Sequence, residues 1–341
     1  MKRGELKDPR KTFGEALLAL AERRPEIIAL SADSSSGSGL SPFKKRFPER
    51  HLEFGIMEQG VIGFAAGLAT TGKIPFVAAI APFLTSRPFE MVRNDLGYMH
   101  QNVKVVGRSA GLTYSDLGPT HQSIDDVALL RTIPGMVVLV PGDPVELVKA
   151  VEAAADHVGP VYLRVGSPPI PVLYETESDC PFRIGAGITM MEGKDVTLIG
   201  TGAALPRAFE AAQALKAEGI GVRLISLPTL KPLDRELLCR AARETGKIVT
   251  VEEHYVAGGL GGAVAELLVR ECPVPMRMVG IQDRFPPSGP YEDVLRDNGL
   301  QPDQIAGVVR EFVSAPGAKS GERTGGRRAK SAGRRRSGAA R

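Results

Sequence analysis

The sequence has few cysteines, and it contains no hydrophobic run long enough to cross a membrane. Its three cysteines, Cys180, Cys239 and Cys272, are widely spaced and fit no zinc-ligand spacing, so we expect reduced thiols in a cytoplasmic protein. No apolar run approaches the ~20 residues that a membrane-spanning helix needs. The first residues lead into no apolar signal region. These absences argue against a disulfide-stabilised secreted protein, a zinc domain and a membrane protein.

An excess of positive charge is also missing from most of the chain, although the formal net charge is +4. Residues 317–341 contain nine Lys or Arg and one Glu, so the rest of the chain has 34 basic and 38 acidic residues. The main part is therefore mildly acidic, and the end at 315–341 is typical of a disordered basic tail. A solvated end is a simpler interpretation of this tail than binding to nucleic acid or to an acidic partner.

Short apolar runs alternate with helical patterns along most of the 341 residues, of which 43% are hydrophobic and 24% charged. The apolar runs lie at 27–33, 75–81, 103–107, 161–165, 196–200, 222–226 and 248–251. This alternation predicts an α/β protein whose mainly parallel sheets are flanked by helices.

The chain is long enough to form two hydrophobic cores. Prolines at 168, 169 and 171 interrupt the strand–helix alternation, which resumes with the apolar run at 196–200. We therefore predict two domains, at 1–167 and 193–314, joined by a linker at 168–192.

The stretch at 53–68 contains the most informative pattern in the sequence. A helix of small residues follows a turn, and it carries a single acid, Glu58, in its first turn. Gly60, Gly63 and Gly67 lie on one face of this helix, and each lowers helix stability by roughly 1 kcal/mol relative to alanine. We expect close packing of another helix on this glycine face to offset the loss, which predicts a buried surface.

Glu58 by itself fits a carboxylate that the helix dipole favours. However, Gly55-Ile56-Met57-Glu58, followed by the small-residue helix, resembles the pyrimidine-binding domain of transketolases. In that family the glutamate hydrogen-bonds N1′ of the aminopyrimidine of thiamine diphosphate, so the resemblance implies this role for Glu58. The segments 118–122 (Gly-Pro-Thr-His-Gln) and 252–261 resemble further transketolase segments, so that the resemblance covers about residues 10–312.

The resemblance implies further cofactor-binding residues. Phe83 is expected to stack on the aminopyrimidine ring, where offset stacking adds of order 1 kcal/mol beyond area burial. Ser86 and Phe89 are expected to line the same pocket, and Asp33 matches a family aspartate near the cofactor. The alternatives are core aromatic residues for Phe83 and Phe89, and a loop-capping carboxylate for Asp33.

The resemblance also implies substrate-binding residues. His121 matches a catalytic histidine that contacts the donor's carbonyl or hydroxyl oxygen, and a loop histidine is the alternative. Arg164 and Arg10 match basic residues that bind the sugar phosphate, and ordinary surface arginines are the alternative. A second family histidine is replaced by Ser109. The aspartate that reads a substrate hydroxyl is replaced by Leu117, with Asp116 one position away, which leaves the identity of the donor open.

One motif of full-length transketolases is absent. They bind Mg²⁺ and the cofactor's diphosphate through Gly-Asp-Gly followed by an asparagine pair, whereas this chain has Gly142-Asp143-Pro144 and no Asn-Asn. A diphosphate needs a cation and hydrogen-bond donors to balance its charge. We therefore expect no metal ligands here, and we expect an N-terminal partner subunit to hold Mg²⁺ and the diphosphate in an α2β2 assembly.

Together these features resemble the C-terminal subunit of a split transketolase, which transfers a two-carbon ketol unit from a ketose or ketose phosphate to an aldose. Three alternatives stay open: an E1 β-type subunit of a 2-oxoacid dehydrogenase, a deoxyxylulose-type ketol synthase, and a non-catalytic assembly or regulatory subunit. Thr-His-Gln at 120–122 and Arg164 argue against the first, and Ser109 and Leu117 favour the second. The joint presence of Glu58, Phe83 and His121 argues against the third.

Overall fold

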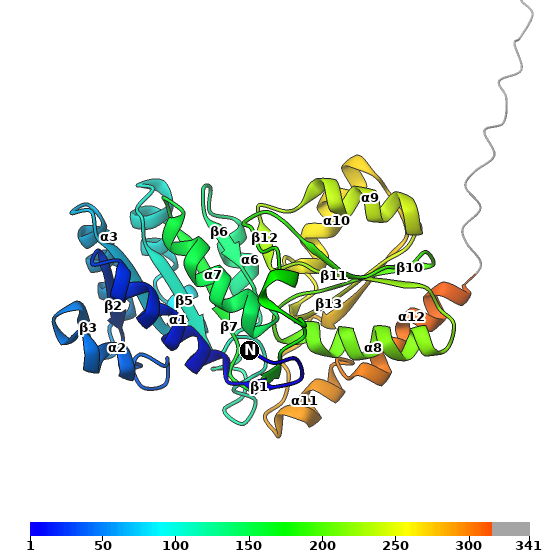
Figure 1. The fold of residues 1–341 in the computed structure, drawn as a ribbon, viewed down its shortest axis with the longest axis horizontal. Helices are drawn as coiled ribbons and strands as arrows, with labels where there is room; N and C mark the ends of the chain where they lie inside the picture. Colours follow the sequence, from blue (N-terminus) through cyan, green and yellow to red (C-terminus); the bar gives the residue numbers. More distant parts are fainter. Residues whose placement is uncertain (316–341) are drawn as a thin grey trace, which may run out of the picture.

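The protein's structure, a computed structural model, describes residues 1–315 and contains two α/β units that lie side by side (Figure 1). The predicted basic tail lies outside the described residues, apart from Ala315. In each unit a mainly parallel sheet is flanked by helices, which confirms the predicted fold class. No helix among residues 1–315 combines the length and the apolar character that a membrane span requires.

The first unit is built on a seven-stranded sheet with the strand order β12-β6-β7-β5-β4-β2-β3. All neighbouring strands are parallel except β12, which pairs antiparallel with β6. The strands are β2 (Ile27–Ser31), β3 (His51–Glu53), β4 (Ile74–Ile80), β5 (Lys104–Arg108), β6 (Val137–Leu139), β7 (Val161–Val165) and β12 (Thr229–Lys231). Because β4, β5 and β7 are buried on both faces, they are nearly continuous apolar runs.

Helices cover both faces of this sheet. The apolar stripe of α1 packs with that of α7 on one face, where Phe13, Leu17 and Leu147 are buried. The opposite face is covered by α3, α6 and η2, whose buried side chains include Val61 and Leu96. The helices of this unit are α1 (Pro9–Arg23), α2 (Ser41–Arg46), η1 (Pro48–Arg50), α3 (Glu58–Ala69), α4 (Ala81–Thr85), α5 (Phe89–Met91), the π-helix η2 (Val92–Tyr98), α6 (Asp126–Arg131) and α7 (Pro144–Asp156).

The second unit is built on a five-stranded sheet with the order β14-β13-β10-β11-β9, in which β9 alone is antiparallel to its neighbour. Its strands are β9 (Ile188–Met191), β10 (Val196–Gly200), β11 (Val222–Ser226), β13 (Ile248–Tyr255) and β14 (Met276–Ile281). Its helices are η4 (Gly202–Ala204), α8 (Leu205–Ala217), α9 (Arg235–Thr245), α10 (Leu260–Glu271), α11 (Tyr291–Asp297) and α12 (Pro302–Ser314).

The two units are joined more closely than the predicted linker suggests. Strand β9 lies inside the predicted linker at 168–192 and already belongs to the second sheet. The rest of that segment contains β8 (Ile170–Pro171), which pairs with β1 (Leu6–Lys7), and the short helix η3 (Glu177–Asp179). Strand β12 leaves the second unit and completes the first sheet. These pairings depend on long-range contacts, which local sequence patterns do not reveal.

The cysteine prediction is wrong for two of the three residues. Cys239 of α9 and Cys272, which follows α10, form a disulfide in the second unit. They lie 33 positions apart in the sequence, and only the packing of α9 against α10 brings them together. Cys180 is a buried free thiol, as predicted.

A buried carboxylate joins the two units. Glu146, in the first turn of α7, accepts hydrogen bonds from the Gly142 N–H (2.7 Å), the Tyr174 hydroxyl (2.7 Å) and the Ser226 hydroxyl (2.5 Å). Ser226 belongs to β11 and Tyr174 to the connecting segment, so one side chain holds three parts of the chain. Burial raises the pKa of Glu146 to about 7, although the three donors oppose this rise.

Replacing Glu146 with glutamine should flatten the pH dependence of stability. The folded-state pKa near 7 exceeds the ordinary value of 4.5, so between these values the folded chain keeps a proton that the unfolded chain has lost. The free energy of unfolding therefore falls as the pH rises through this window, by up to about 1.4 kcal/mol per pH unit. Urea unfolding across the window measures this slope. Equal slopes for the wild type and Glu146→Gln would contradict the prediction.

Candidate active site

Glu58 begins α3 directly after β3 and its turn, and its side chain is 6% exposed. Its carboxylate accepts a hydrogen bond from Arg87 Nη1 at 2.7 Å. The guanidinium of Arg87 also lies over the ring of Phe83, with its central carbon 3.9 Å from the ring centroid. A planar cation therefore stacks on Phe83 and donates to Glu58 at the same time.

Phe83 also contacts the loop that contains His121. The rings of Phe83 and His121 meet edge to face with centroids 5.2 Å apart, and the Tyr114 ring meets His121 at 6.0 Å. The Thr120 hydroxyl lies 2.9 Å from Nδ1 of His121 and orients the imidazole. Nε2, which has no hydrogen-bond partner within residues 1–315, is then the ring nitrogen that can reach a substrate.

Arg108, the last residue of β5, is a buried arginine at 6% exposure. Its guanidinium donates to the hydroxyls of Tyr114 (2.6 Å), Ser109 (3.1 Å) and Ser34 (3.4 Å). Its Nε has no partner, and no carboxylate in the described part of the chain pairs with it. A buried cation without a counterion is unfavourable, so this arginine is suited to bind an anion.

The surroundings of Tyr114 are positively charged as well. Burial alone would raise the pKa of the Tyr114 hydroxyl, but hydrogen bonding to Arg108 and the charges of Arg108 and Arg10 hold that pKa below its usual value. Arg10 itself is half-buried and pairs with Asp8 at 2.9 Å. Its pKa is raised, first of all by the hydrogen bonds to Asp8.

These side chains form one continuous series of contacts: Glu58, Arg87, Phe83, His121, Tyr114 and Arg108. They come from the segments that follow β3 and β4, from the end of β5, and from the loop after β5. The carboxyl ends of parallel strands meet at one edge of a sheet, where α/β proteins bind ligands. The series has a carboxylate at one end, a histidine near the middle and a buried arginine at the other end.

Arg164 does not belong to this series. It lies at the interface of the two units, 6% exposed, where its Nε pairs with Asp126 at 2.8 Å. Its Nη2 donates to the backbone carbonyls of Ser123 (2.8 Å) and Glu253 (3.0 Å). Burial alone would lower the pKa of Arg164, but the ion pair with Asp126 raises it. This position supports a structural role, and phosphate binding by Arg164 stays a prediction.

Four other predicted site residues lie at the edge of the series or outside it. Phe89 packs against the hydrophobic core, and Ser86 is an exposed residue that ends α4. Asp116 is exposed on the loop. Asp33 is exposed at the end of β2 with a φ of 50°, and its N–H donates to Glu53 at 2.7 Å.

The sequence analysis missed Arg87, Tyr114 and Arg108. Arg87 follows directly after Ser86, which was expected to line the cofactor pocket, so a shift of one residue would have found it. Arg108 is a charged residue at the end of an otherwise apolar strand, next to Ser109, where a second histidine was sought. Its burial without a counterion, which marks it as a ligand-binding residue, is visible only in the structure.

The glycine face of α3 is not buried within this chain, which corrects the predicted packing surface. Gly63 and Gly67 are exposed, and a Cβ at Gly67 would meet nothing within 4 Å. Exposed apolar side chains lie nearby in the sequence: Ile56 is 75% exposed, Met57 49% and Phe64 45%. A smooth apolar surface of this kind is typical of a contact with another chain.

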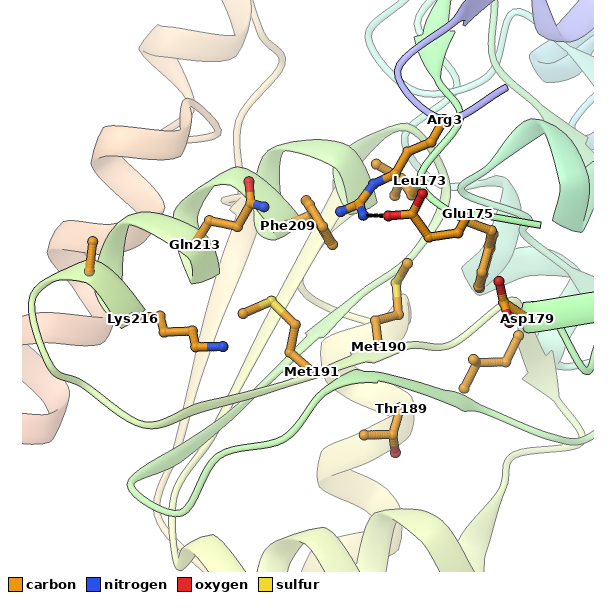
Figure 2. A pocket seen from close by; sticks show the side chains of 13 residues that line it. Arg3, Leu173, Glu175, Asp179, Thr189, Met190, Met191, Phe209, Gln213 and Lys216 are labelled. Carbon is orange, nitrogen blue, oxygen red and sulfur yellow. Dashed lines mark hydrogen bonds and ion pairs between the residues drawn. The ribbon is translucent and has the colours of Figure 1, made fainter. Parts of the chain in front are cut away.

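A pocket of about 720 Å³ lies elsewhere, between the connecting segment, β9 and α8 (Figure 2). Figure 2 shows Met190, Met191 and Phe209 along its wall and the ion pair of Arg3 with Glu175 at its rim. None of the residues in the contact series lines this pocket. The pocket is therefore not part of the candidate active site, although it is large.

Two family models match the chain. The model for the transketolase pyrimidine-binding domain matches residues 7–168, and the model for the transketolase C-terminal domain matches residues 185–305. The chain belongs to the transketolase family. The two matches coincide with the two α/β units, and the contact series lies within the pyrimidine-binding domain.

The proteins similar to this chain include separate C-terminal parts of transketolases. A transketolase C-terminal section from Methanocaldococcus jannaschii is 38% identical, and the match covers 90% of this chain and 97% of that protein. A subunit of an apulose-4-phosphate transketolase from Phocaeicola vulgatus is 40% identical over 89% of this chain and 97% of its own length. A 6-deoxy-6-sulfo-D-fructose transketolase subunit from a Clostridium species is 38% identical, with coverages of 89% and 94%.

A solved structure of a split gene transketolase is also similar to this chain. It is described as a split gene transketolase, inactive β4 tetramer, and it superposes with a TM-score of 0.83 at 42% sequence identity. The match covers 90% of this chain and 98% of the other. This transketolase chain therefore has the same fold as that split gene transketolase chain over 90% of its residues.

An inorganic anion should stabilise this transketolase chain through Arg108. Phosphate or sulfate that binds only the folded state should raise the melting temperature, with about 2.7 kcal/mol of stabilisation at a concentration about 100-fold above Kd. The variant Arg108→Leu should lose this effect, whereas Arg93→Leu, which removes an exposed arginine of η2, should keep it. Thermal unfolding against anion concentration is the measurement. Equal responses of the two variants would exclude Arg108 as the anion site.

Proposed function

We propose that this chain is the C-terminal subunit of a thiamine-diphosphate-dependent transketolase that transfers a two-carbon ketol unit from a ketose to an aldose. The observation that carries the proposal is the contact series, in which the buried Glu58, the ring of Phe83 and His121 lie in sequence. Family membership and the full-length match to separate C-terminal sections support the same function.

The residues present fit one end of the cofactor. Phe83 offers an aromatic face, and Glu58 offers a carboxylate to a nitrogen of a planar ring, as the planar Arg87 guanidinium demonstrates in this chain. The described residues hold no group of three or more His, Cys, Asp or Glu side chains suited to a metal ion. We therefore propose that Mg²⁺ and the diphosphate are held by the partner subunit, and that two copies of each subunit form the enzyme.

The exposed glycine face of α3 supports this division. Glu58 begins the same helix, so a partner that covers Gly63 and Gly67 lies within a few helical turns of the ring-binding residues. Closing the site between two chains excludes water and strengthens the electrostatic interactions within it. Relatives that are named as a C-terminal section and as transketolase subunits agree with such a two-chain enzyme.

Three residues of the contact series have distinct roles in the mechanism that we propose. When bound, thiamine diphosphate supplies the nucleophilic carbon and the electron sink needed to break a carbon–carbon bond beside a carbonyl. Glu58 holds a proton between its carboxyl oxygen and the N1′ atom of the ring. His121 Nε2 exchanges a proton with the hydroxyl or carbonyl oxygen of the sugar at the bond that breaks. Phe83 fixes the plane of the ring beside this histidine.

Arg108 indicates which sugars bind. It lies beyond His121 and Tyr114, at the end of the series away from Glu58, where the far end of a sugar chain would lie. We propose that the donor carries a terminal anionic group that supplies the missing counterion. Two relatives act on substrates whose names contain a phosphate and a sulfo group. A guanidinium binds either group through paired N–H donors.

The three alternatives have less support. Both family models are transketolase models, and the relatives described above carry transketolase names, which favours ketol transfer between sugars over a 2-oxoacid dehydrogenase. Arg108 beside Ser109 supplies a charged substrate contact where the second histidine is missing, so this departure no longer favours a deoxyxylulose-type enzyme. A non-catalytic role leaves the buried, unpaired Arg108 without a purpose.

Replacing Glu58 with glutamine should abolish most of the activity while the assembly stays intact. The amide has nearly the same shape but cannot share a proton with N1′, so kcat should fall by about 10²–10⁴-fold. Ketol transfer with the partner subunit, Mg²⁺ and cofactor measures the effect, and gel filtration checks the assembly. Glu49→Gln, at an exposed glutamate of η1, is the control. Near-normal turnover of Glu58→Gln would refute the assignment.

Removing Arg87 should strengthen binding of the aminopyrimidine ring to the chain alone, since Arg87 occupies the contacts proposed for that ring. From the strengths of its exposed ion pair and its stacking on Phe83, we expect the Kd of the aminopyrimidine to fall by about threefold to tenfold when Arg87 is removed. Ligand-observed NMR with 4-amino-5-hydroxymethyl-2-methylpyrimidine would compare Arg87→Met with the wild type. Arg93→Met is the matched control. Equal or weaker binding by Arg87→Met would show that the ring binds elsewhere.

A further inference from the structure

The loop at 111–123, which contains Tyr114 and His121, lies between the two units. Its ends are joined by two backbone hydrogen bonds between Gly111 and Ser123, each 2.9 Å long. The loop therefore leaves and re-enters the first unit at one point. Contacts along its length decide where its two site residues lie.

Glu253 of β13, in the second unit, contacts the start of this loop. Its buried carboxylate accepts the Leu112 N–H (3.2 Å) and the Tyr291 hydroxyl (2.5 Å). A Cβ at Gly111, where φ is +74°, would lie 2.7 Å from Glu253 Oε2, so a larger residue does not fit. Burial raises the pKa of Glu253, while the Tyr291 hydrogen bond and the nearby Arg207 oppose the rise.

The segment at 287–289, just before α11, contacts the rest of the loop. The Gly289 N–H donates to the Ser115 carbonyl at 3.1 Å, and Gln122 Nε2 donates to the Pro287 carbonyl at 3.2 Å. These two hydrogen bonds lie on either side of the most exposed part of the loop. The second unit therefore holds the loop at three places.

Two further contacts complete this arrangement. Gly118 lies so close to Ser288 that a Cβ at position 118 would be 2.1 Å from the serine Oγ. Arg164 donates both to the Ser123 carbonyl at the end of the loop and to the Glu253 carbonyl. The ion pair of Arg164 with Asp126 thus anchors the loop end and the strand that carries Glu253 together.

We propose that the second domain positions the substrate loop, with Tyr291 and Glu253 as positioning residues that act through Leu112 on Tyr114 and His121. The assignment of His121 and Tyr114 to substrate binding rests on the proposed function. The contacts that hold the loop do not depend on it, so the two proposals can fail separately.

The hydrogen bond from Tyr291 matters because Glu253 is buried. With the hydroxyl removed, the Leu112 N–H is the remaining donor to a carboxylate that burial already disfavours. The carboxyl group then takes up a proton or turns toward another donor. Either change weakens its contact with the loop.

The variant Tyr291→Phe tests the proposal, and Tyr174→Phe is its matched control. Both tyrosines donate a hydroxyl to a buried glutamate, but Tyr174 donates to Glu146, away from the loop. Hydrogen exchange of the full chain should be faster at residues 111–123 in Tyr291→Phe by about tenfold or more. Tyr174→Phe should leave this segment within about twofold of the wild type.

Kinetics of the assembled enzyme give the second measurement. A displaced loop should raise the KM for the donor by about tenfold in Tyr291→Phe, while the affinity for thiamine diphosphate stays unchanged. Glu253→Gln should raise the KM for the donor by only about threefold. Its amide oxygen can still accept a hydrogen bond from the Leu112 N–H, and its amide nitrogen can donate to the Tyr291 oxygen. A purely structural role would lower stability in both tyrosine variants without this selective change in KM.

Each result of these measurements supports or overturns one of the two proposals. Faster exchange confined to the loop, with a raised donor KM, supports the proposal. Equal exchange at 111–123 in the two tyrosine variants overturns it, even if Tyr291→Phe is less stable. If the assembled wild type transfers no ketol unit, the proposed function fails and the exchange comparison still decides whether the loop is positioned by the second domain.

Discussion

The central physical constraint in this protein is a buried carboxylate whose hydrogen-bond partner among residues 1–315 is an exposed arginine. Glu58 lies at the first turn of α3, and in this structure the guanidinium of Arg87 satisfies it while stacking on Phe83. A buried carboxylate needs a donor, and a planar donor fits this space. The proposed cofactor ring meets the same two requirements, and the exposed glycine face beside it leaves room for the chain that would hold the rest of the cofactor.

A second buried charge lies at the opposite end of the site. Arg108 has hydroxyl partners but no counterion among residues 1–315, and the proposed anionic group of the donor would supply one. With Glu58 assigned to the cofactor ring at one end, the arginine at the other end would orient a sugar that has an anionic terminus. His121, between them, would then face the carbon–carbon bond that breaks. The electrostatics of the site thus supply both orientation and selectivity.

Much of the fold could be predicted because local patterns dominate it. Buried parallel strands are continuous apolar runs, and β7, β10 and β11 lie where the sequence placed them. Glu58, Phe83 and His121 were predicted through resemblance, and the structure brings them together. The ion pair of Arg164 with Asp126, 38 positions away in the chain, could not be predicted from local sequence patterns. The disulfide was missed for the same kind of reason, since α9 and α10 meet only through tertiary packing.

By itself, the sequence determined the α/β class, the acid at the start of a glycine-rich helix and the lack of a diphosphate-binding motif, because each depends on residues that are near one another in the chain. Only the tertiary structure decided that the glycine face is exposed, that Arg108 is buried without a counterion, and that the second domain contacts the loop with His121. Burial and charge pairing depend on which distant segments come together. Local sequence does not specify those contacts, and they distinguish Arg108, which is buried without a counterion, from Arg164, which pairs with Asp126 between the two domains.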